Sequence, residues 1–144
     1  SNFYQKIRFK IVLGKYEKYN FKANYLKDNF FYFKNLTNQK FLKLASNCQI
    51  AIGSGGVSCW ERIYLGLVNF VIITAKNQTF ATKQMNKSKY IFNLGVKNNI
   101  SKVQLKKKLN KVLLDKQIIK NIYNKSSKVL LENKVLTIIN YLKL

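Results

Sequence analysis

The chain has 144 residues, with 27 lysines and arginines against five aspartates and glutamates, a formal net charge of +22 and no histidine. This length suits one core, and we expect a single domain over residues 1–144. Without histidine, the chain cannot supply a histidine base. No apolar run approaches the ~20 residues of a membrane-spanning helix. The two cysteines lack metal-ligand spacing. We therefore predict a soluble protein without a metal or cofactor.

The positive charge suggests an acidic partner, of which nucleic acid is the first to consider. The lysines are scattered through every predicted element, however, and the chain has neither an aromatic-glycine RNA motif nor zinc ligands. We therefore interpret most of them as a solvated surface, with non-specific polyanion binding expected at low salt.

The N-terminal third predicts two strands. Alternating apolar residues indicate a strand over residues 7–13 that Gly14 ends, and a second strand follows at residues 30–33. A short helix is expected at residues 21–26 between them. The loop after the first strand faces the ligand in nucleotide-binding domains, which makes Gly14 and Lys15 candidate lining residues.

The middle of the chain predicts a βαβ unit. A helix starting at Thr37 leads to a strand over residues 49–52, a glycine turn, a helix over residues 57–65 and a strand over residues 70–73. Such a unit has parallel strands and a right-handed crossover.

The C-terminal half continues the alternation of strand and helix. The expected elements are a helix at residues 82–89, a strand at 90–94 stopped by Gly95, a turn at 97–99, a helix capped by Ser101, and helices at 115–131 and 132–144. The whole pattern predicts an α/β fold, with a Rossmann-like parallel sheet flanked by helices.

The glycine turn Gly53-Ser54-Gly55-Gly56 offers a place for an anion. It lies between strand and helix, where free N–H groups and the positive end of the helix dipole favour phosphate. Glu61, about one turn into the helix, can accept hydrogen bonds from ligand hydroxyls. The turn is neither a P-loop nor a G-x-G-x-x-G fingerprint. Two structural readings stay open: the glycines serve packing alone, and Ser58 with Glu61 forms a capping box.

Four motifs resemble the C-terminal domain of the UDP-sugar hydrolases of pseudaminic acid biosynthesis: Ala51-Ile52-Gly53-Ser54-Gly55-Gly56, Trp60-Glu61-Arg62, Leu65-Gly66-Leu67 and Asn77-Gln78. These hydrolases belong to the glycosyltransferase-B superfamily, as does the transferase that adds N-acetylglucosamine in peptidoglycan synthesis. The similarity is dense over residues 30–94 and thin outside them. Val68 stands where the family usually has proline, which bears on the rigidity of the next strand's start.

The resemblance implies a UDP site. The residues around the diphosphate would be Ser54, Gly55, Gly56, Val57 and Ser58. Glu61 would accept from the ribose hydroxyls, Asn77 and Gln78 would face the phosphates or the sugar, and the loop at Phe33, Lys34 and Asn35 would contact the base. Aromatic residues in strands are more often core, so Phe33 keeps that alternative. We expect Trp60 to be core, and Arg62, about 100° around the helix from Glu61, to pair elsewhere.

The resemblance also implies a role for the chain within a larger protein. It would be the C-terminal half of a cytoplasmic UDP-sugar hydrolase or glycosyltransferase-like enzyme, with the acceptor or water side supplied by an N-terminal domain outside this fragment. Because the family's histidine base belongs to that domain, no catalytic residue is assigned here, and the fragment alone is expected to bind without turnover. The alternative is a non-catalytic basic module that binds an acidic partner such as nucleic acid.

Overall fold

The computed structural model describes residues 7–14 and 28–131 of the chain. The predicted helices at residues 21–26 and 132–144, and the candidate Lys15, lie outside these residues. The chain divides into two compact units, Ser1–Lys43 and Leu44–Leu144, which are described separately. The single domain over residues 1–144 stays a prediction.

The first unit contains two short parallel strands. Strand β1 (Phe9–Leu13) pairs with β2 (Phe30–Lys34) in a register that runs from Phe9 opposite Phe30 to Leu13 opposite Lys34. The rings of Phe9 and Phe30 stack with centroids 4.6 Å apart. Both predicted strands are present, and β2 extends one residue beyond its predicted end.

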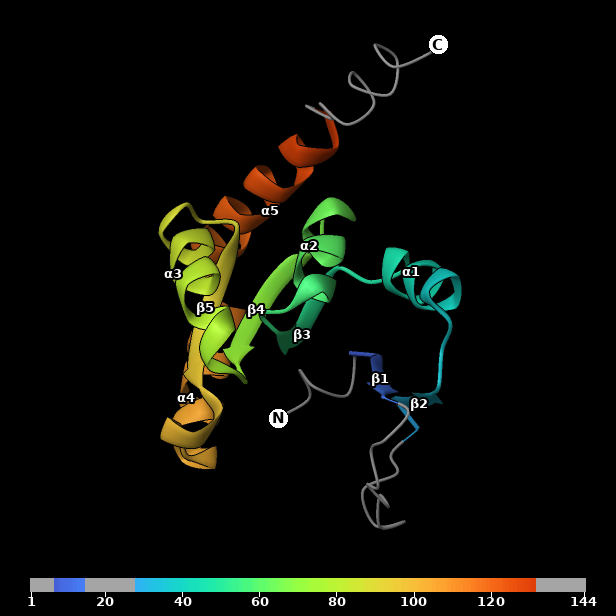
Figure 1. Cartoon of the computed structure of the whole chain (residues 1–144), viewed down its shortest axis with the longest axis horizontal. Helices are drawn as coiled ribbons and strands as arrows, with labels where there is room; N and C mark the ends of the chain where they lie inside the picture. Colours follow the sequence, from blue (N-terminus) through green and yellow to red (C-terminus); the bar gives the residue numbers. More distant parts are fainter. Residues whose placement is uncertain (1–6, 15–27, 132–144) are drawn as a thin grey trace. The chain divides into compact units, whose positions relative to one another are not determined.

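The second unit is built on a parallel sheet of three strands in the order β3 (Ile50–Ser54), β4 (Val68–Ile73) and β5 (Ile91–Val96). Helix α2 (Val57–Tyr64) connects β3 to β4, which confirms the predicted βαβ unit (Figure 1). The remaining helical segments are α1 (Asn38–Ser46), which contains the division between the units, η3 (Lys76–Gln78), α3 (Thr79–Lys87), η4 (Lys97–Asn99), α4 (Lys102–Leu114) and α5 (Lys116–Leu131).

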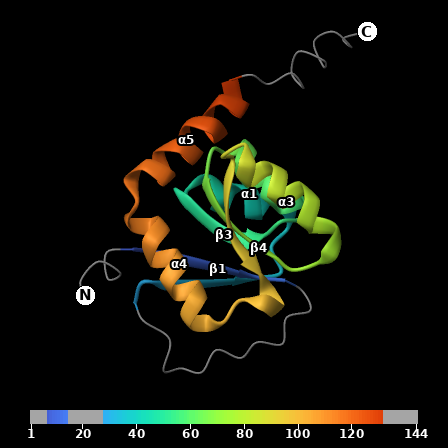
Figure 2. The same ribbon diagram turned by 90° about the vertical axis from the view of Figure 1, so that its left-hand side faces the viewer.

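Helices cover both faces of this sheet because β4 is apolar on both sides. Val71 packs with residues of α2 and α3 such as Ile63 and Met85. Its neighbour Phe70 points to the other face and packs with Val112 of α4 and other residues of α4 and α5. Figure 2 shows α3 and the α4–α5 pair on opposite sides of the strands.

Among the strand boundaries that differ from the predictions, those of β4 and β5 have local explanations. Val68 begins β4 two residues early because its N–H donates to the carbonyl oxygen of Gln49 at 3.0 Å, a bond that a proline there could not make. The prediction that Gly95 stops β5 is wrong. The register shifts beside Leu94, and Gly95 continues the strand with φ of +129°, a conformation that suits a glycine at a β-bulge.

The two C-terminal helices begin at side-chain caps. Ser101 and Gln104 form a reciprocal capping box at the start of α4, as the sequence predicts for Ser101. The Asp115 carboxylate accepts from the N–H groups of Gln117 and Ile118 and starts α5. These caps explain why two lysine-rich helices begin at defined residues.

The fold is therefore a mixed α/β structure with parallel strands flanked by helices, compatible with a Rossmann-like fold. Within residues 7–14 and 28–131, no helix has the length and apolar character needed to cross a membrane.

Candidate anion site at the carboxyl ends of the strands

Two loops meet at the carboxyl ends of β3 and β4. In the parallel register Ser54, the last residue of β3, lies opposite Ile72 of β4, so the glycine turn and the 74–78 loop leave the sheet at the same edge. Gly55 is buried there. A methyl group on it would collide with the Thr82 hydroxyl and lie 3.6 Å from Cβ of Gln78. This close approach explains the need for glycine at position 55.

Gly56 lies where polar groups converge. It is the N-cap of α2, with φ of −81° and ψ of −161°. A methyl group on it would lie 3.7 Å from Nε2 of Gln78 and 4.0 Å from Oγ of Ser54. The Cys59 N–H bonds to the Gly56 carbonyl oxygen at 2.9 Å, which leaves the Val57 and Ser58 N–H groups as the first of the helix.

The Gln78 side chain is oriented by the loop that carries it. Its Oε1 accepts from the N–H of Thr74 at 3.0 Å and from the Thr74 hydroxyl at 3.1 Å. With the oxygen engaged, the Nε2 group beside Gly56 is the end that can donate to a ligand. Asn77 is exposed in the same loop.

Arg62 is the buried cation behind the glycine turn. Only 7% of its surface is exposed, and its guanidinium donates from Nε to Oδ1 of Asn69 at 2.8 Å. The same group donates to the carbonyl oxygen of Ser54 at 2.9 Å and to Oγ of Ser58 at 3.2 Å. A methyl group on Gly53 would lie 2.9 Å from this guanidinium. Arg62 thus ties the end of β3 to β4 and to its own helix.

The hydrogen bonds of Arg62 go to neutral groups, and the Glu61 carboxylate acts on it only through its charge. Burial lowers the pKa of Arg62 from its ordinary value, and burial also raises the pKa of the neighbouring Cys59 thiol, which favours its neutral form. Its acceptors on Asn69, Ser58 and Ser54 are an amide, a hydroxyl and a carbonyl oxygen. A buried cation without a bonded carboxylate favours an anion in its neighbourhood, in addition to the dipole of α2.

Glu61 is half-buried one turn into α2, and its carboxylate makes no hydrogen bond with the part of the chain that the structure describes. The capping-box alternative for Ser58 and Glu61 is wrong. Gly56 is the N-cap, no side chain caps the helix, and the Ser58 hydroxyl, inside the helix, accepts from Arg62. The Glu61 carboxylate is therefore available to accept from a ligand.

The remaining candidates lie in the first unit. Gly14 follows β1, and Phe33 and Lys34 end β2, so the register places them together at the carboxyl ends of that strand pair. Phe33 is half-buried, while Gly14 and Lys34 are exposed. Asn35 has φ of +54°, the left-handed conformation that asparagine tolerates in a turn.

The prediction that Trp60 belongs to the core is wrong, because 56% of its surface is exposed. The buried face of α2 contains Cys59, Arg62 and Ile63. Trp60 lies with Val57 and Tyr64 on the opposite, exposed stripe, at the spacing of three and four residues that a helix requires.

Sequence reasoning missed three polar residues that shape the site: Thr74, Asn69 and Thr82. Asn69 carried a visible signal, since it interrupts the apolar run of β4 and is completely buried. Thr82 gave no such signal, and its buried hydroxyl has no hydrogen-bond partner. Within the described ranges, no three metal-binding side chains lie together.

Comparison of the chain with protein-family models and with curated proteins found no match. Function is therefore inferred from the groups around the glycine turn and from the sequence motifs that surround it.

Proposed function

We propose that this chain is the UDP-sugar-binding C-terminal domain of a nucleotide-sugar hydrolase or glycosyltransferase-like enzyme of the glycosyltransferase-B superfamily. The parent enzyme would act in the cytoplasm, in pseudaminic acid or related surface-polysaccharide biosynthesis. The sugar and the choice between hydrolysis and transfer belong to that proposal through the resemblance alone.

The observation that carries the proposal is the convergence of donors on Gly56. The Nε2 of Gln78 lies 3.7 Å, and Oγ of Ser54 4.0 Å, from the position of a methyl group on that glycine. The first N–H groups of α2 and the positive end of its dipole are at the same place. This set of neutral donors, with buried Arg62 behind it, suits a diphosphate better than a neutral ligand.

Each group then has a task in binding. The turn residues Ser54 to Ser58 hold the diphosphate, Glu61 accepts from the ribose hydroxyls, and Asn77 and Gln78 contact the phosphates or the sugar. When the bond to the anomeric carbon breaks, negative charge grows on the departing UDP, and the donors at the helix N-terminus stabilise it. The base that activates water or an acceptor comes from the N-terminal domain.

Calorimetric titration with UDP at about 0.15 M salt tests this proposal, and separate titrations with AMP and with tRNA are the controls. We expect UDP to bind in preference to AMP and Glu61→Ala to weaken UDP binding about tenfold or more, because the ribose loses a charged acceptor. Asp28→Ala is the control, since it removes one negative charge from an exposed residue outside the site.

The alternative is a non-catalytic basic module for an acidic partner, which the net charge of +22 favours. In that case UDP, AMP and tRNA would bind in proportion to their charge, Glu61→Ala would behave like Asp28→Ala, and binding would fall steeply with added salt. That outcome would remove the UDP site from this chain.

A further inference from the structure

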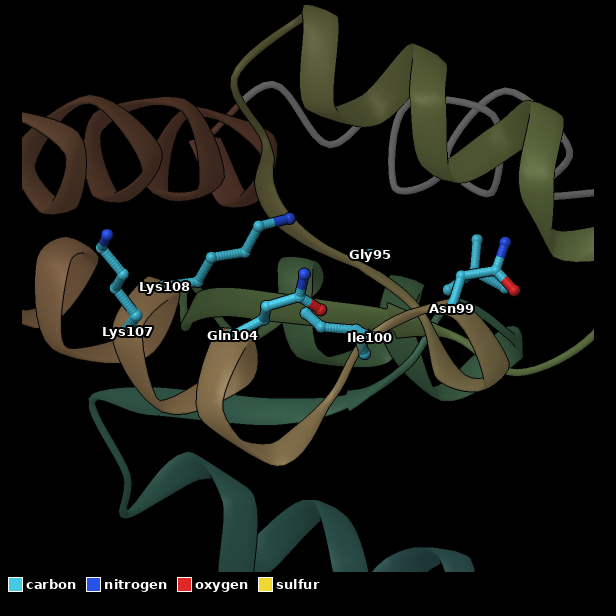
Figure 3. Close-up of a pocket in the computed structure, with 7 residues that line it drawn as sticks. Gly95, Asn99, Ile100, Gln104, Lys107 and Lys108 are labelled. Atoms are coloured by element: carbon cyan, nitrogen blue, oxygen red, sulfur yellow. The ribbon is translucent and has the colours of Figure 1, made fainter.

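A hollow lies at the carboxyl end of β5, away from the glycine turn. It has a volume of about 390 Å³ and is lined by Gly95, Val96, Asn99, Ile100, Gln104, Lys107 and Lys108 (Figure 3). None of these residues belongs to the proposed UDP site. The volume falls within the range of small-molecule sites, roughly 300–1,000 Å³.

The floor of the hollow is shaped by the β-bulge at Leu94. The bulge takes the Leu94 carbonyl oxygen out of the regular ladder, and Nζ of Lys108 donates to it at 2.9 Å. Figure 3 shows the amine of Lys108 directed at the ribbon of β5. Bulges at the end of a strand often re-aim groups next to binding sites. The bulge therefore fixes one ammonium group at the floor and leaves two of its three N–H donors for other partners.

The polar side chains around the hollow offer donors. Oε1 of Gln104 already accepts from the N–H of Ser101 at 2.9 Å, so its amide nitrogen is the end left for a ligand. Lys107 and Lys108, three and four residues further along α4, lie on the same face of that helix as Gln104. Among residues 7–14 and 28–131, no carboxylate lines the hollow. A ligand here must supply acceptors, and two ammonium groups favour a negatively charged one.

Apart from Asn99, the remaining lining is apolar. Ile100 and Val96 contribute aliphatic surface beside Gly95, whose missing side chain leaves room: a methyl group there would lie 3.5 Å from Ile100 and 3.7 Å from Nζ of Lys108. The φ of +129° at Gly95 also disfavours any larger residue. An apolar wall facing a set of donors suits a ligand with an oxyanion at one end and an apolar or ring body at the other.

We propose that this hollow is a second binding site, which takes a small organic oxyanion, a phosphate or carboxylate carried on an apolar or aromatic body. Lys107 and Lys108 bind the oxyanion, the Gln104 amide donates to it, and Ile100 and Val96 contact the body. The site shares no residue with the proposed UDP site, and β4 separates β3 from β5, so that the ends of those two strands lie roughly 10 Å apart.

Nuclear magnetic resonance titration of the full chain at about 0.15 M salt tests this site, with phenyl phosphate, benzoate and benzamide as probes. Phenyl phosphate and benzoate distinguish the two oxyanions, and benzamide is the neutral analogue. We expect saturable shifts of the Gly95 and Asn99 amide signals with at least one of the two anions, and no saturation with benzamide.

Two variants and a charge-matched control make the test specific. Lys107→Gln/Lys108→Gln should weaken binding of the anion at least about tenfold, and Lys107→Gln alone about threefold. The single variant leaves the Lys108 contact with Leu94 intact, so it keeps the test valid if the double variant does not fold. Lys102→Gln/Lys106→Gln removes the same charge from the other side of α4 and should change binding less than about twofold.

Two results would overturn the proposal. In the first, the shifts are spread over the lysine-rich surface, and Lys107→Gln/Lys108→Gln and Lys102→Gln/Lys106→Gln reduce them equally. This result would mean that the anions bind through the net charge of the chain. The other is no saturable shift at Gly95 or Asn99 with either anion. Because the probes contain no uridine, neither result bears on the UDP site, and failure of UDP binding leaves this site standing.

Discussion

At the residue scale, the candidate site depends on one close contact between two loops. Gly55 lies directly against Thr82, so that a methyl group on Gly55 would overlap the Thr82 hydroxyl. That hydroxyl is completely buried and has no hydrogen-bond partner, which itself costs stability. The geometry of the turn thus depends on the absence of a side chain at Gly55 and on the size of the Thr82 side chain.

We predict that Gly55→Ala destabilises the chain by about 2–4 kcal/mol, because the new methyl group has no room and the buried turn must move. Urea unfolding followed by circular dichroism measures this. The control is Gly14→Ala, which has nothing within 4 Å of the added methyl and should change stability by less than about 1 kcal/mol. Adding Thr82→Ala to Gly55→Ala should recover part of the lost stability. Equal destabilisation by Gly55→Ala and Gly14→Ala would contradict the close packing of Gly55 against Thr82.

Some features of the candidate site can be predicted from the local sequence, and others cannot. The glycine turn and Glu61 are candidates because of their places after a predicted strand, since strand, turn and helix are encoded locally. Asn77 and Gln78 are candidates through the resemblance. One of the three bonds of Arg62 goes to Asn69, seven residues later on strand β4. No local pattern reports such a contact, although a lone asparagine in an apolar strand is a signal that can be used.

At the element scale, α2 has one buried and one exposed apolar stripe. Cys59 and Ile63 are buried against β4 and α3, whereas Val57, Trp60 and Tyr64 are exposed. Both stripes follow helical spacing, so hydrophobicity alone could not tell which one faces the sheet. The choice of face follows from Arg62, because its bond to Asn69 requires the Cys59–Ile63 side to lie on the sheet.

We predict that Trp60→Ala changes the free energy of unfolding by less than about 1 kcal/mol, whereas Ile63→Ala costs about 2–4 kcal/mol through the cavity it creates. Denaturant unfolding of the two variants beside the unaltered chain measures the difference. A loss for Trp60→Ala as large as that for Ile63→Ala would mean that Trp60 is packed in solution and would contradict its exposure.

At the scale of the whole molecule, charge dominates. With only five carboxylate side chains against 27 basic ones, most of the positive charge is uncompensated, and its self-repulsion opposes compaction. Salt screens that repulsion over about 8–10 Å at physiological ionic strength.

We predict that raising sodium chloride from about 0.02 M to 0.5 M increases the thermal midpoint by about 3–8 °C, because screening relieves repulsion that is strongest in the folded state. Calorimetric or circular dichroism melting measures the change. Lys102→Glu/Lys106→Glu should raise the midpoint at low salt and make it less sensitive to salt. A midpoint that falls with salt would indicate that attractive pairs outweigh the repulsion.

The sequence by itself determined the order of strands and helices, the parallel βαβ unit, the cap at Ser101 and the position of the glycine turn at a strand end. These features follow from periods of two and 3.6 residues and from turn chemistry, which act over a few neighbouring residues. Only the tertiary structure decided the burial of Arg62, the exposure of Trp60, the contact of Gly55 with Thr82 and the bulge at Leu94. Each of these depends on residues from different elements that compete for one buried space, and that competition is resolved by packing.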